Sequence, residues 1–350
     1  MSSDKPIVTA ILSYGMSGEV FHAPLLEALS GFKLKTILER KTEKSKQHYP
    51  SIKIARTIDE VLNDEDIELV VVNTPNDTHY DFTVKALEAG KHVIVEKPFT
   101  NTSEDASKLI ELAKKKQKLL SVFQSRRWDG GFLTLKNIII SGVLGRIVEY
   151  EAHYDRFRNY ITPNTWKEKA GPGSGILYNL GSHMLDQVLV LFGKPESVSA
   201  RIGIQRPGGK VDDYYDLRLS YKEINVIVKS SYLVREPGPV YTVHGVNGSF
   251  VKYGLDPQEE ALKHHQTPGT PGWGKEPEKY WGKINTEIDG VAHEGKIETV
   301  PGNYPGYYQN IYEAVREGKE LAVTAEQGMK VIQLIEAALK SNKEKREISY

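Results

Sequence analysis

A lysine that follows a short apolar run is the first residue whose position could support chemistry. Lys97 comes after residues 92–95 (HVIV) and Glu96, and Pro98 follows it. A β-branched run that ends at proline predicts a buried strand that stops there, because proline cannot donate to a sheet ladder. Ligands of open α/β sheets bind outside the carboxyl ends of the strands, so we expect Lys97 to face a ligand. The alternative is an ordinary surface pair of Glu96 and Lys97.

A second group of chemically useful side chains lies on a predicted helix, residues 175–187. Asn179, His183 and Asp186 are spaced i, i+4 and i+7, so they share one helix face. Burying such a polar stripe without partners is costly, so it faces either water or a functional site. Oxidation of an alcohol needs a base near neutral pH, which histidine supplies, and a cation such as lysine to favour the alkoxide. A lone histidine on a helix is nevertheless more often structural.

A strand–turn–helix pattern near the N-terminus could hold the phosphates of a dinucleotide. Residues 7–12 predict a strand that runs into residues 13–18 (SYGMSG), a G-x-G-x-x-G fingerprint with serine at its first position. Gly15 would let the pyrophosphate approach, and Gly18 would let the helix pack on the strand. The candidate cofactor ligands in this turn are Ser13, Tyr14, Gly15, Met16 and Ser17.

The residues after the second predicted strand bear on which dinucleotide is bound. Glu39 lies 21 residues after Gly18, where the fingerprint expects an acid that binds the ribose 2′-hydroxyl of NAD. Arg40, followed by Lys41 and Lys44, could instead hold the 2′-phosphate of NADP. A carboxylate repels a phosphate, so NADP binding requires Glu39 to turn away. A solvated helix start is the alternative explanation of the basic group.

The pattern of elements changes part-way along the chain. Strands are expected at 7–12, 34–38, 67–72, 92–95 and 119–123, and helices at 58–62, at 79–89 between caps at Thr78 and Gly90, and from a cap at Ser103. Later, strands are expected at 146–155, 197–206, 213–221, 224–233 and 241–245, helices at 132–141 and 325–341, and an irregular excursion at 256–302. We therefore predict an α/β protein: an N-terminal Rossmann domain with a doubly wound parallel sheet (1–122) and a C-terminal α+β domain (123–350) with a large, mostly antiparallel, open-faced sheet.

Composition restricts the possible partners. Lys plus Arg and Asp plus Glu both number 46, and cysteine is absent. Zero net charge provides no electrostatic footprint for nucleic acid or an anionic membrane, and the lack of cysteine excludes disulfides and thiolate chemistry. No run approaches the roughly 18 apolar residues of a membrane span, so we expect a cytoplasmic protein. We predict no metal.

The open face of the second sheet bears on oligomerisation. Tyr214, Leu217 and Leu219 are apolar side chains of one predicted strand that need cover. We therefore expect a homodimer or tetramer formed through this sheet, and a simply polar, solvated face is the alternative.

Several motifs resemble those of the Gfo/Idh/MocA oxidoreductase family. They are the turn at residues 14–18, the loop Asn73–His79, the Glu96-Lys97-Pro98 segment, and the glycine-rich turn before Asn179 and His183. Residues 21–24, 126–128 and 253–259, with Trp166, resemble the branch of that family that acts on inositols with NADP.

The resemblance implies NADP, with NAD possible, and hydride transfer at a hydroxyl-bearing carbon of a cyclic polyol or sugar. It implies that Lys97 contacts the reacting hydroxyl and that His183 is the base, whereas Asn179 replaces the family's usual aspartate. Further cofactor contacts are expected from Asn73, Thr74, Pro75, Asn76, His79, Glu96 and Arg126. Substrate contacts are expected from Arg127, Tyr154, Arg156, Tyr160, Trp166 and Asp186.

Two alternatives keep the fold but change the activity. Asn179 can orient an imidazole but cannot stabilise its charged form, which favours a cofactor-binding sensor with little turnover. The other alternative is redox-assisted sugar chemistry in which NAD stays bound and is recycled.

Overall fold

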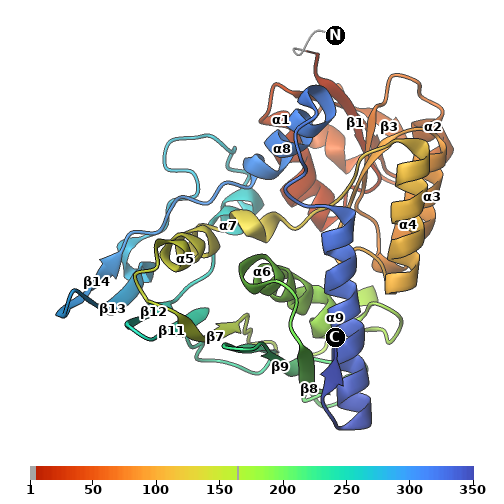
Figure 1. Ribbon diagram of the computed structural model, residues 1–350. Coiled ribbons are helices and arrows are strands. Elements are labelled where there is room, and N and C mark those ends of the chain that lie inside the picture. The colour runs from red at the N-terminus through yellow and green to blue at the C-terminus, as the bar shows by residue number, and fades with distance from the viewer. Residues whose placement is uncertain (1–4, 164) are drawn as a thin grey trace. The chain divides into compact units, whose positions relative to one another are not determined.

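The computed structural model describes residues 5–163 and 165–350, which form two compact units (Figure 1). Unit 1 contains the chain up to Trp128 together with Pro257–Trp273 and Asn303–Met329. Unit 2 contains Asp129–Asp256, Gly274–Gly302 and Lys330–Tyr350. Each unit is assembled from three stretches of chain, whereas the sequence predicts a single division after residue 122.

Unit 1 is built on a parallel six-stranded sheet with the strand order β3-β2-β1-β4-β5-β6. The strands are β1 (Ile7–Ile11), β2 (Phe32–Leu38), β3 (Lys53–Ala55), β4 (Leu69–Val72), β5 (His92–Val95) and β6 (Leu120–Val122). All of β4 is buried, as a parallel strand covered on both faces should be. The predicted doubly wound sheet is confirmed, and its order reverses between β1 and β4, where such folds bind ligands.

The helical elements of unit 1 up to residue 116 connect these strands, and those from residue 125 onward follow β6 in the chain. They are η1 (Gly18–His22), α1 (Ala23–Glu27), η2 (Lys44–Gln47), α2 (Ile58–Leu62), η3 (Asn76–Thr78), α3 (His79–Glu88), α4 (Ser103–Lys116), η4 (Ser125–Trp128), α7 (Gln258–Lys263) and α8 (Pro305–Glu317). Figure 1 shows α3 and α4 side by side.

Two of the expected helix caps are wrong. Thr102 rather than Ser103 caps α4, because Thr102 has an extended backbone and its hydroxyl accepts the Asp105 N–H at 3.1 Å. The Thr78 side chain caps nothing in α3, because its hydroxyl instead donates to the Pro75 carbonyl at 2.6 Å.

Unit 2 is built on a nine-stranded sheet with the order β14-β13-β12-β11-β7-β10-β9-β8-β15. Only β7 and β10 pair in parallel; the other pairs are antiparallel, which confirms the mostly antiparallel prediction among the described residues. The strands are β7 (Ile147–His153), β8 (Ser197–Gly203), β9 (Tyr214–Ser220), β10 (Asn225–Ser231), β11 (Tyr241–Gly245), β12 (Gly248–Lys252), β13 (Gly282–Ile288), β14 (Val291–Ile297) and β15 (Ile348–Ser349).

The hairpin of β13 and β14 lies within the stretch that was expected to be irregular, so that expectation is wrong for residues 282–297. Nearly all of β14 is exposed at the sheet edge. A strand that buries almost nothing has no need of the apolar alternation by which strands are predicted.

Two helices, α5 (Gly130–Ser141) and α6 (Ser182–Phe192), cover one face of this sheet (Figure 1). Leu217 and Leu219 are 0% and 2% exposed and alternate along β9 with the more exposed Asp216 and Arg218. The expected apolar open face is therefore wrong for these two leucines, because they belong to the covered face. Tyr214 alone of the expected three lies on the other, largely polar face.

The last helix, α9 (Ala325–Glu344), buries Val331, Ile332, Ile335 and Ala338, whereas Leu339 is exposed. A helix with the length and apolarity to cross a membrane does not occur among the described residues.

Candidate active site

The carboxyl ends of β1 and β4 are joined where the sheet order reverses. The side-chain amide of Asn73, just after β4, donates from Nδ2 to the Ser13 carbonyl at 2.8 Å. Asn73 is 5% exposed, and its Oδ1 has no hydrogen-bond partner among the described residues. A buried amide oxygen left unpaired is costly, so its position indicates a ligand that donates to it.

The two glycines of the turn after β1 have different surroundings. A Cβ on Gly18 would lie 2.1 Å from the Ser13 carbonyl oxygen, so η1 packs against the strand too closely for any side chain. A Cβ on Gly15 would meet nothing nearer than Ser13 Oγ at 3.5 Å, and Gly15 and Met16 are exposed. The outer side of the turn is thus open to a phosphate, and the residues fit the pyrophosphate of a dinucleotide.

The carboxylate of Glu39, at the end of β2, is occupied by its own loop. Oε2 accepts hydrogen bonds from Thr42 Oγ1 at 2.6 Å and the Lys44 N–H at 2.9 Å, and Oε1 accepts from the Ser45 N–H at 3.0 Å and Ser45 Oγ at 2.5 Å. Glu39 is only 4% exposed. Burial acts to raise the pKa of Glu39, but the hydrogen bonds from Ser45, Thr42 and Lys44 outweigh it and the pKa is lowered. The side chain is turned away from solvent and stays ionised.

The neighbouring Arg40, in contrast to the buried Glu39, has an exposed side chain. Its guanidinium carbon lies 5.8 Å from the centre of the Phe82 ring. Arg56, which is also exposed, holds the same loop by donating to the carbonyls of Glu39 at 2.8 Å and Thr42 at 2.6 Å. The loop is therefore fixed, with an arginine on its surface.

The end of β5 carries Glu96 and Lys97, as predicted. The Lys97 N–H donates to Glu96 Oε2 at 3.0 Å, and Glu96 Oε1 lies 3.0 Å from His22 Nε2. Lys97 is half-buried, and the Lys97–Pro98 peptide bond is cis.

His79 joins the loop after β4 to the segment after β5. It is 0% exposed, with Nε2 2.9 Å from the Thr74 carbonyl and Nδ1 2.9 Å from the Pro98 carbonyl. Burial lowers the pKa of His79 against the pull of both carbonyls, so the ring is neutral and donates to only one of them. His79 therefore braces the two loops, and its cofactor contact stays a prediction.

The two arginines after β6 are engaged within unit 1. Arg126 is buried and its Nη2 lies 2.6 Å from Glu259 Oε2. Burial alone would raise the pKa of Glu259, but Arg126 and Lys263 lower it to about 2. Arg127 donates to the Ala322 carbonyl at 2.5 Å and to Gln327 Oε1 at 2.9 Å. These contacts hold both arginines against other parts of unit 1. Their predicted contacts with a ligand stay predictions.

The predicted polar helix of unit 2 is not one regular α-helix. A π-helical turn, η6 (Leu177–Gly181), carries Asn179, and α6 carries His183 and Asp186, which are 6% and 2% exposed. Asp212 holds the start of this segment: its Oδ2 accepts the Leu177 N–H at 2.9 Å, and its carbonyl accepts the Ile176 N–H at 2.9 Å. Burial raises the pKa of Asp212 to about 6.

Gly175 makes that capping possible. Its φ is +92°, and a Cβ there would lie 1.8 Å from Asp212 Oδ1. The predicted glycine-rich turn is thus needed for a close approach of a carboxylate to the helix start, and any side chain at 175 would displace it.

The predicted substrate residues have different surroundings in unit 2. Tyr154 is 1% exposed, and its hydroxyl lies 3.4 Å from Asp129 Oδ2 and 3.3 Å from the Tyr241 hydroxyl, so it belongs to a buried polar chain rather than a surface. Arg156 donates to the Asp155 carbonyl at 3.1 Å, and Tyr160 is 60% exposed. The side chain of Trp166 lies outside the part of the chain that the structure describes.

Comparison with known proteins decides the family. Residues 7–124 match the family described as "Oxidoreductase family, NAD-binding Rossmann fold", and residues 136–349 match "Oxidoreductase family, C-terminal alpha/beta domain". The chain belongs to the Gfo/Idh/MocA oxidoreductase family.

Three relatives illustrate how far the similarity extends. The chain is 43% identical to scyllo-inositol 2-dehydrogenase (NADP(+)) IolW of Bacillus subtilis over 98% of this chain and 95% of that one. The solved structure of YvaA from Bacillus subtilis has a TM-score of 0.96 at 40% identity and covers 100% of both chains. An oxidoreductase from Bacillus cereus has a TM-score of 0.91 at 33% identity and covers 98% of both chains. The predicted family and fold are confirmed.

Sequence reasoning missed several residues of this Gfo/Idh/MocA protein that hold its site residues. Asp212 lies 37 positions after Gly175, and the buried chain of Tyr154, Tyr241 and Gln187 joins three elements, with the Tyr241 hydroxyl 2.9 Å from Gln187 Oε1. No local pattern marks either arrangement. Thr42 and Ser45 were a detectable signal, because hydroxyls three and six residues after an acid often bind it locally.

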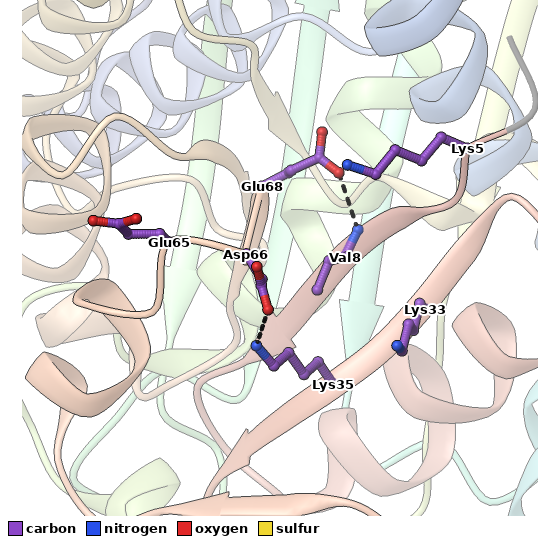
Figure 2. Close-up of a pocket in the computed structure, with 7 residues that line it drawn as sticks. All are labelled: Lys5, Val8, Lys33, Lys35, Glu65, Asp66 and Glu68. Carbon is purple, nitrogen blue, oxygen red and sulfur yellow. Dashed lines mark hydrogen bonds and ion pairs between the residues drawn. The ribbon is translucent and has the colours of Figure 1, made fainter. Parts of the chain in front are cut away.

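A hollow of about 340 Å³ in unit 1 lies at the opposite ends of the strands. Figure 2 shows its lining of Lys5, Val8, Lys33, Lys35, Glu65, Asp66 and Glu68. Lys35 pairs with Asp66 at 2.7 Å, and Glu68 accepts the Val8 N–H at 3.4 Å. The hollow lies away from the carboxyl ends that bind ligands in this fold.

One group of possible metal ligands occurs among the described residues: Glu19, His48 and His265, with ligand atoms within 4.8 Å of one another. Two of the three are exposed, and the two imidazoles stack face to face with centroids 4.6 Å apart. Stacked rings do not aim their nitrogens at one point as ligands do, so we assign no metal here.

Proposed function

We propose that this oxidoreductase is an NADP-dependent dehydrogenase of a cyclic polyol of the inositol class, with NAD as the second candidate cofactor and related sugars as the second substrate class. The observation that carries the proposal is the end of β5, which presents Lys97 beside the strand ends that fit a dinucleotide. The name of IolW, an NADP-dependent scyllo-inositol dehydrogenase, supports the substrate class.

The dinucleotide would be held by the turn of residues 13–18, by the loop of Asn73–Asn76 and by Arg40. When bound, the nicotinamide supplies the acceptor or donor of the hydride. Lys97 places a cation against the oxygen of the reacting carbon, which favours the alkoxide over the alcohol. His183 takes the proton of the hydroxyl, since an imidazole is a base near neutral pH.

Asn179 and Asp186 accompany His183 on its helical segment. Asn179 offers the imidazole a hydrogen-bonding amide but no charge, so we assign it an orienting role. Lys97 belongs to unit 1 and His183 to unit 2, and the roles of both follow those of the matching family residues.

The surroundings of Glu39 favour NADP. A free ribose 2′-hydroxyl would have to compete with four hydrogen bonds that Glu39 already accepts. A 2′-phosphate meets no exposed carboxylate from Glu39, and the exposed Arg40 can bind it with two parallel hydrogen bonds.

The test is reduction of NADP or NAD, followed by the ultraviolet absorbance of the reduced nicotinamide, with scyllo-inositol, myo-inositol, glucose and xylose. Turnover with NADP and one inositol supports the proposal. Tight cofactor binding without turnover of any of the four compounds would contradict it and favour a sensor. A homodimer or tetramer formed through the second sheet and a cytoplasmic location stay predictions of the sequence.

A further inference from the structure

A buried chain of three side chains ends at the residue before Lys97. His22, in η1, is 0% exposed; its Nδ1 lies 2.7 Å from the Tyr308 hydroxyl and its Nε2 lies 3.0 Å from Glu96 Oε1. Tyr308, in α8, is also 0% exposed. The ring of His22 packs on Phe123 with centroids 4.5 Å apart, which fixes its plane. The chain therefore joins three elements that are far apart in sequence.

The hydrogens in the Tyr308–His22–Glu96 hydrogen-bond chain can be assigned from its two ends. Burial would raise the pKa of Glu96, but the hydrogen bonds from His22 and the Lys97 N–H, together with the charge of Lys97, outweigh it and the pKa is lowered. An ionised Glu96 only accepts, so His22 Nε2 carries a hydrogen. Burial raises the pKa of Tyr308 far above its ordinary value, so the phenol keeps its proton. We assign His22 as the neutral tautomer with its hydrogen on Nε2, so the phenolic O–H donates a hydrogen bond to Nδ1.

Glu96 is coupled to Lys97 in two ways. Oε2 of Glu96 accepts the Lys97 N–H at 3.0 Å, which fixes the backbone that carries the lysine. The two charges also attract, and that attraction acts equally on both partners. Glu96 also interacts electrostatically with His79, Tyr307 and Tyr308.

We propose that Tyr308 and His22 are positioning residues for Lys97: through Glu96 they fix its backbone and hold a negative charge beside its ammonium group. The proposal rests on the catalytic role of Lys97 in the proposed function. Without this hydrogen-bond chain, Glu96 would lose its donor and take up a proton, and the ammonium of Lys97 would lose the attraction of that charge.

Tyr307, the residue next to Tyr308, offers a matched control. Tyr307 lies in the same helix, is 1% exposed and also uses its hydroxyl in a buried hydrogen bond, 2.8 Å from Ser121 Oγ. Tyr307→Phe and Tyr308→Phe therefore each remove one buried phenolic hydroxyl, with a similar expected loss of stability. Only Tyr308→Phe removes a hydrogen bond of the Tyr308–His22–Glu96 chain.

The experiment is an NMR titration of the Lys97 side chain in the cofactor-free full-length protein, with ¹³C-dimethylated lysines and the Lys97 signal assigned from Lys97→Arg. His22→Phe, which keeps the ring packing but removes the donor to Glu96, should lower the pKa of Lys97 by about 0.5–1 unit. Tyr308→Phe should lower it by a smaller amount, because the freed imidazole can take the tautomer whose lone pair faces Glu96. Tyr307→Phe should leave it unchanged.

Equal titration of Lys97 in the wild type, Tyr308→Phe and His22→Phe would overturn the proposal. An equal shift in Tyr307→Phe and Tyr308→Phe would also overturn it, since a general loosening would then be responsible. The titration uses neither cofactor nor substrate, so its outcome is independent of whether the protein turns over a polyol. In kinetics, Tyr308→Phe should lower kcat several-fold more than Tyr307→Phe, with the KM for NADP within two-fold.

Discussion

The ends of β2 and β5 each present a glutamate at the ligand-binding edge of the same sheet, but the two carboxylates serve different purposes. Glu39 is satisfied by donors within six residues, namely Thr42, Lys44 and Ser45. Glu96 is satisfied by His22, which lies 74 positions away, and through it by Tyr308. The first arrangement stabilises a loop, whereas the second connects a strand end to two distant elements.

This difference shows that spacing alone does not assign a ligand. Glu39 occupies the position at which the fingerprint expects a ribose-binding acid, but four local donors take up its oxygens. Glu96 has fewer local donors, so its charge remains available to a neighbour. The number of hydrogen-bond donors close in sequence therefore distinguishes a carboxylate that stabilises its own loop from one whose charge acts on a neighbouring site residue.

The largest expected effect is at the end of β5. Lys97→Ala should reduce kcat by about 10²–10³-fold, because the alkoxide loses its stabilising cation. The dissociation constant for NADP should stay within a few-fold. Lys114→Ala, an exposed lysine in α4 paired with Glu326, is the surface control and should leave kcat unchanged. Wild-type turnover in Lys97→Ala would remove this lysine from the mechanism.

The next effect is at the end of β2. Arg40→Ser should reduce the preference for NADP over NAD by about 10–100-fold, the contribution of a charge-assisted hydrogen-bond pair. The ratio of kcat/KM for the two cofactors measures it. Lys53→Ser is a suitable control, because Lys53 is an exposed base of the neighbouring β3 that pairs with Asp64. A ratio in Arg40→Ser equal to that of the wild type would show that another residue binds the 2′-phosphate.

A smaller effect concerns acid stability. The pKa of Glu39 is lowered in the folded protein, so its ionised form stabilises the fold above the unfolded-state pKa of about 4.5. That stabilisation disappears as the pH falls through the folded-state pKa. Glu39→Gln should therefore cost about 1–3 kcal/mol at pH 7 and progressively less in acid. Denaturant unfolding across pH measures the difference, and an equal cost at every pH would contradict it.

Asp212 should contribute a pH dependence of the free energy of unfolding with the opposite sign. Its pKa is raised to about 6, so the free energy of unfolding decreases as the pH rises from about 4 to about 6 and stays lower above that. Asp212→Asn keeps an oxygen for the Leu177 N–H and removes the buried charge. The variant should flatten this pH dependence by about 1–3 kcal/mol in unfolding experiments. An unchanged slope between pH 4 and 6 would exclude Asp212 as its source.

The parts of the site that sequence predicts best are those built from adjacent residues. The turn at 13–18, the segment 96–98 and the strands of the parallel sheet follow from local patterns of glycine, proline and β-branched residues. The uses of Glu39, His22 and Asp212 depend on which donors the fold brings to a carboxylate. The Tyr308–His22 pair spans 286 positions, and no periodicity records such a contact.

The same reasoning explains the errors in the second unit. Leu217 and Leu219 were assigned to an open face because alternation shows that a strand has two faces but does not show which face helices cover. The hairpin of β13 and β14 was missed because its edge strand buries almost nothing. The π-helical turn that carries Asn179 leaves no mark in the spacing either.

The most direct test of the account is the ratio of kcat/KM for NADP over NAD in the wild type and in Glu39→Gln, measured with the inositol that turns over. The account predicts that the wild type prefers NADP by about ten-fold or more and that Glu39→Gln keeps this ratio within two-fold. The reason is that the wild-type carboxylate of Glu39 binds donors of its own loop and does not contact the cofactor. A wild-type preference for NAD, or a large shift toward NADP in Glu39→Gln, would show that Glu39 contacts the ribose and would contradict the account.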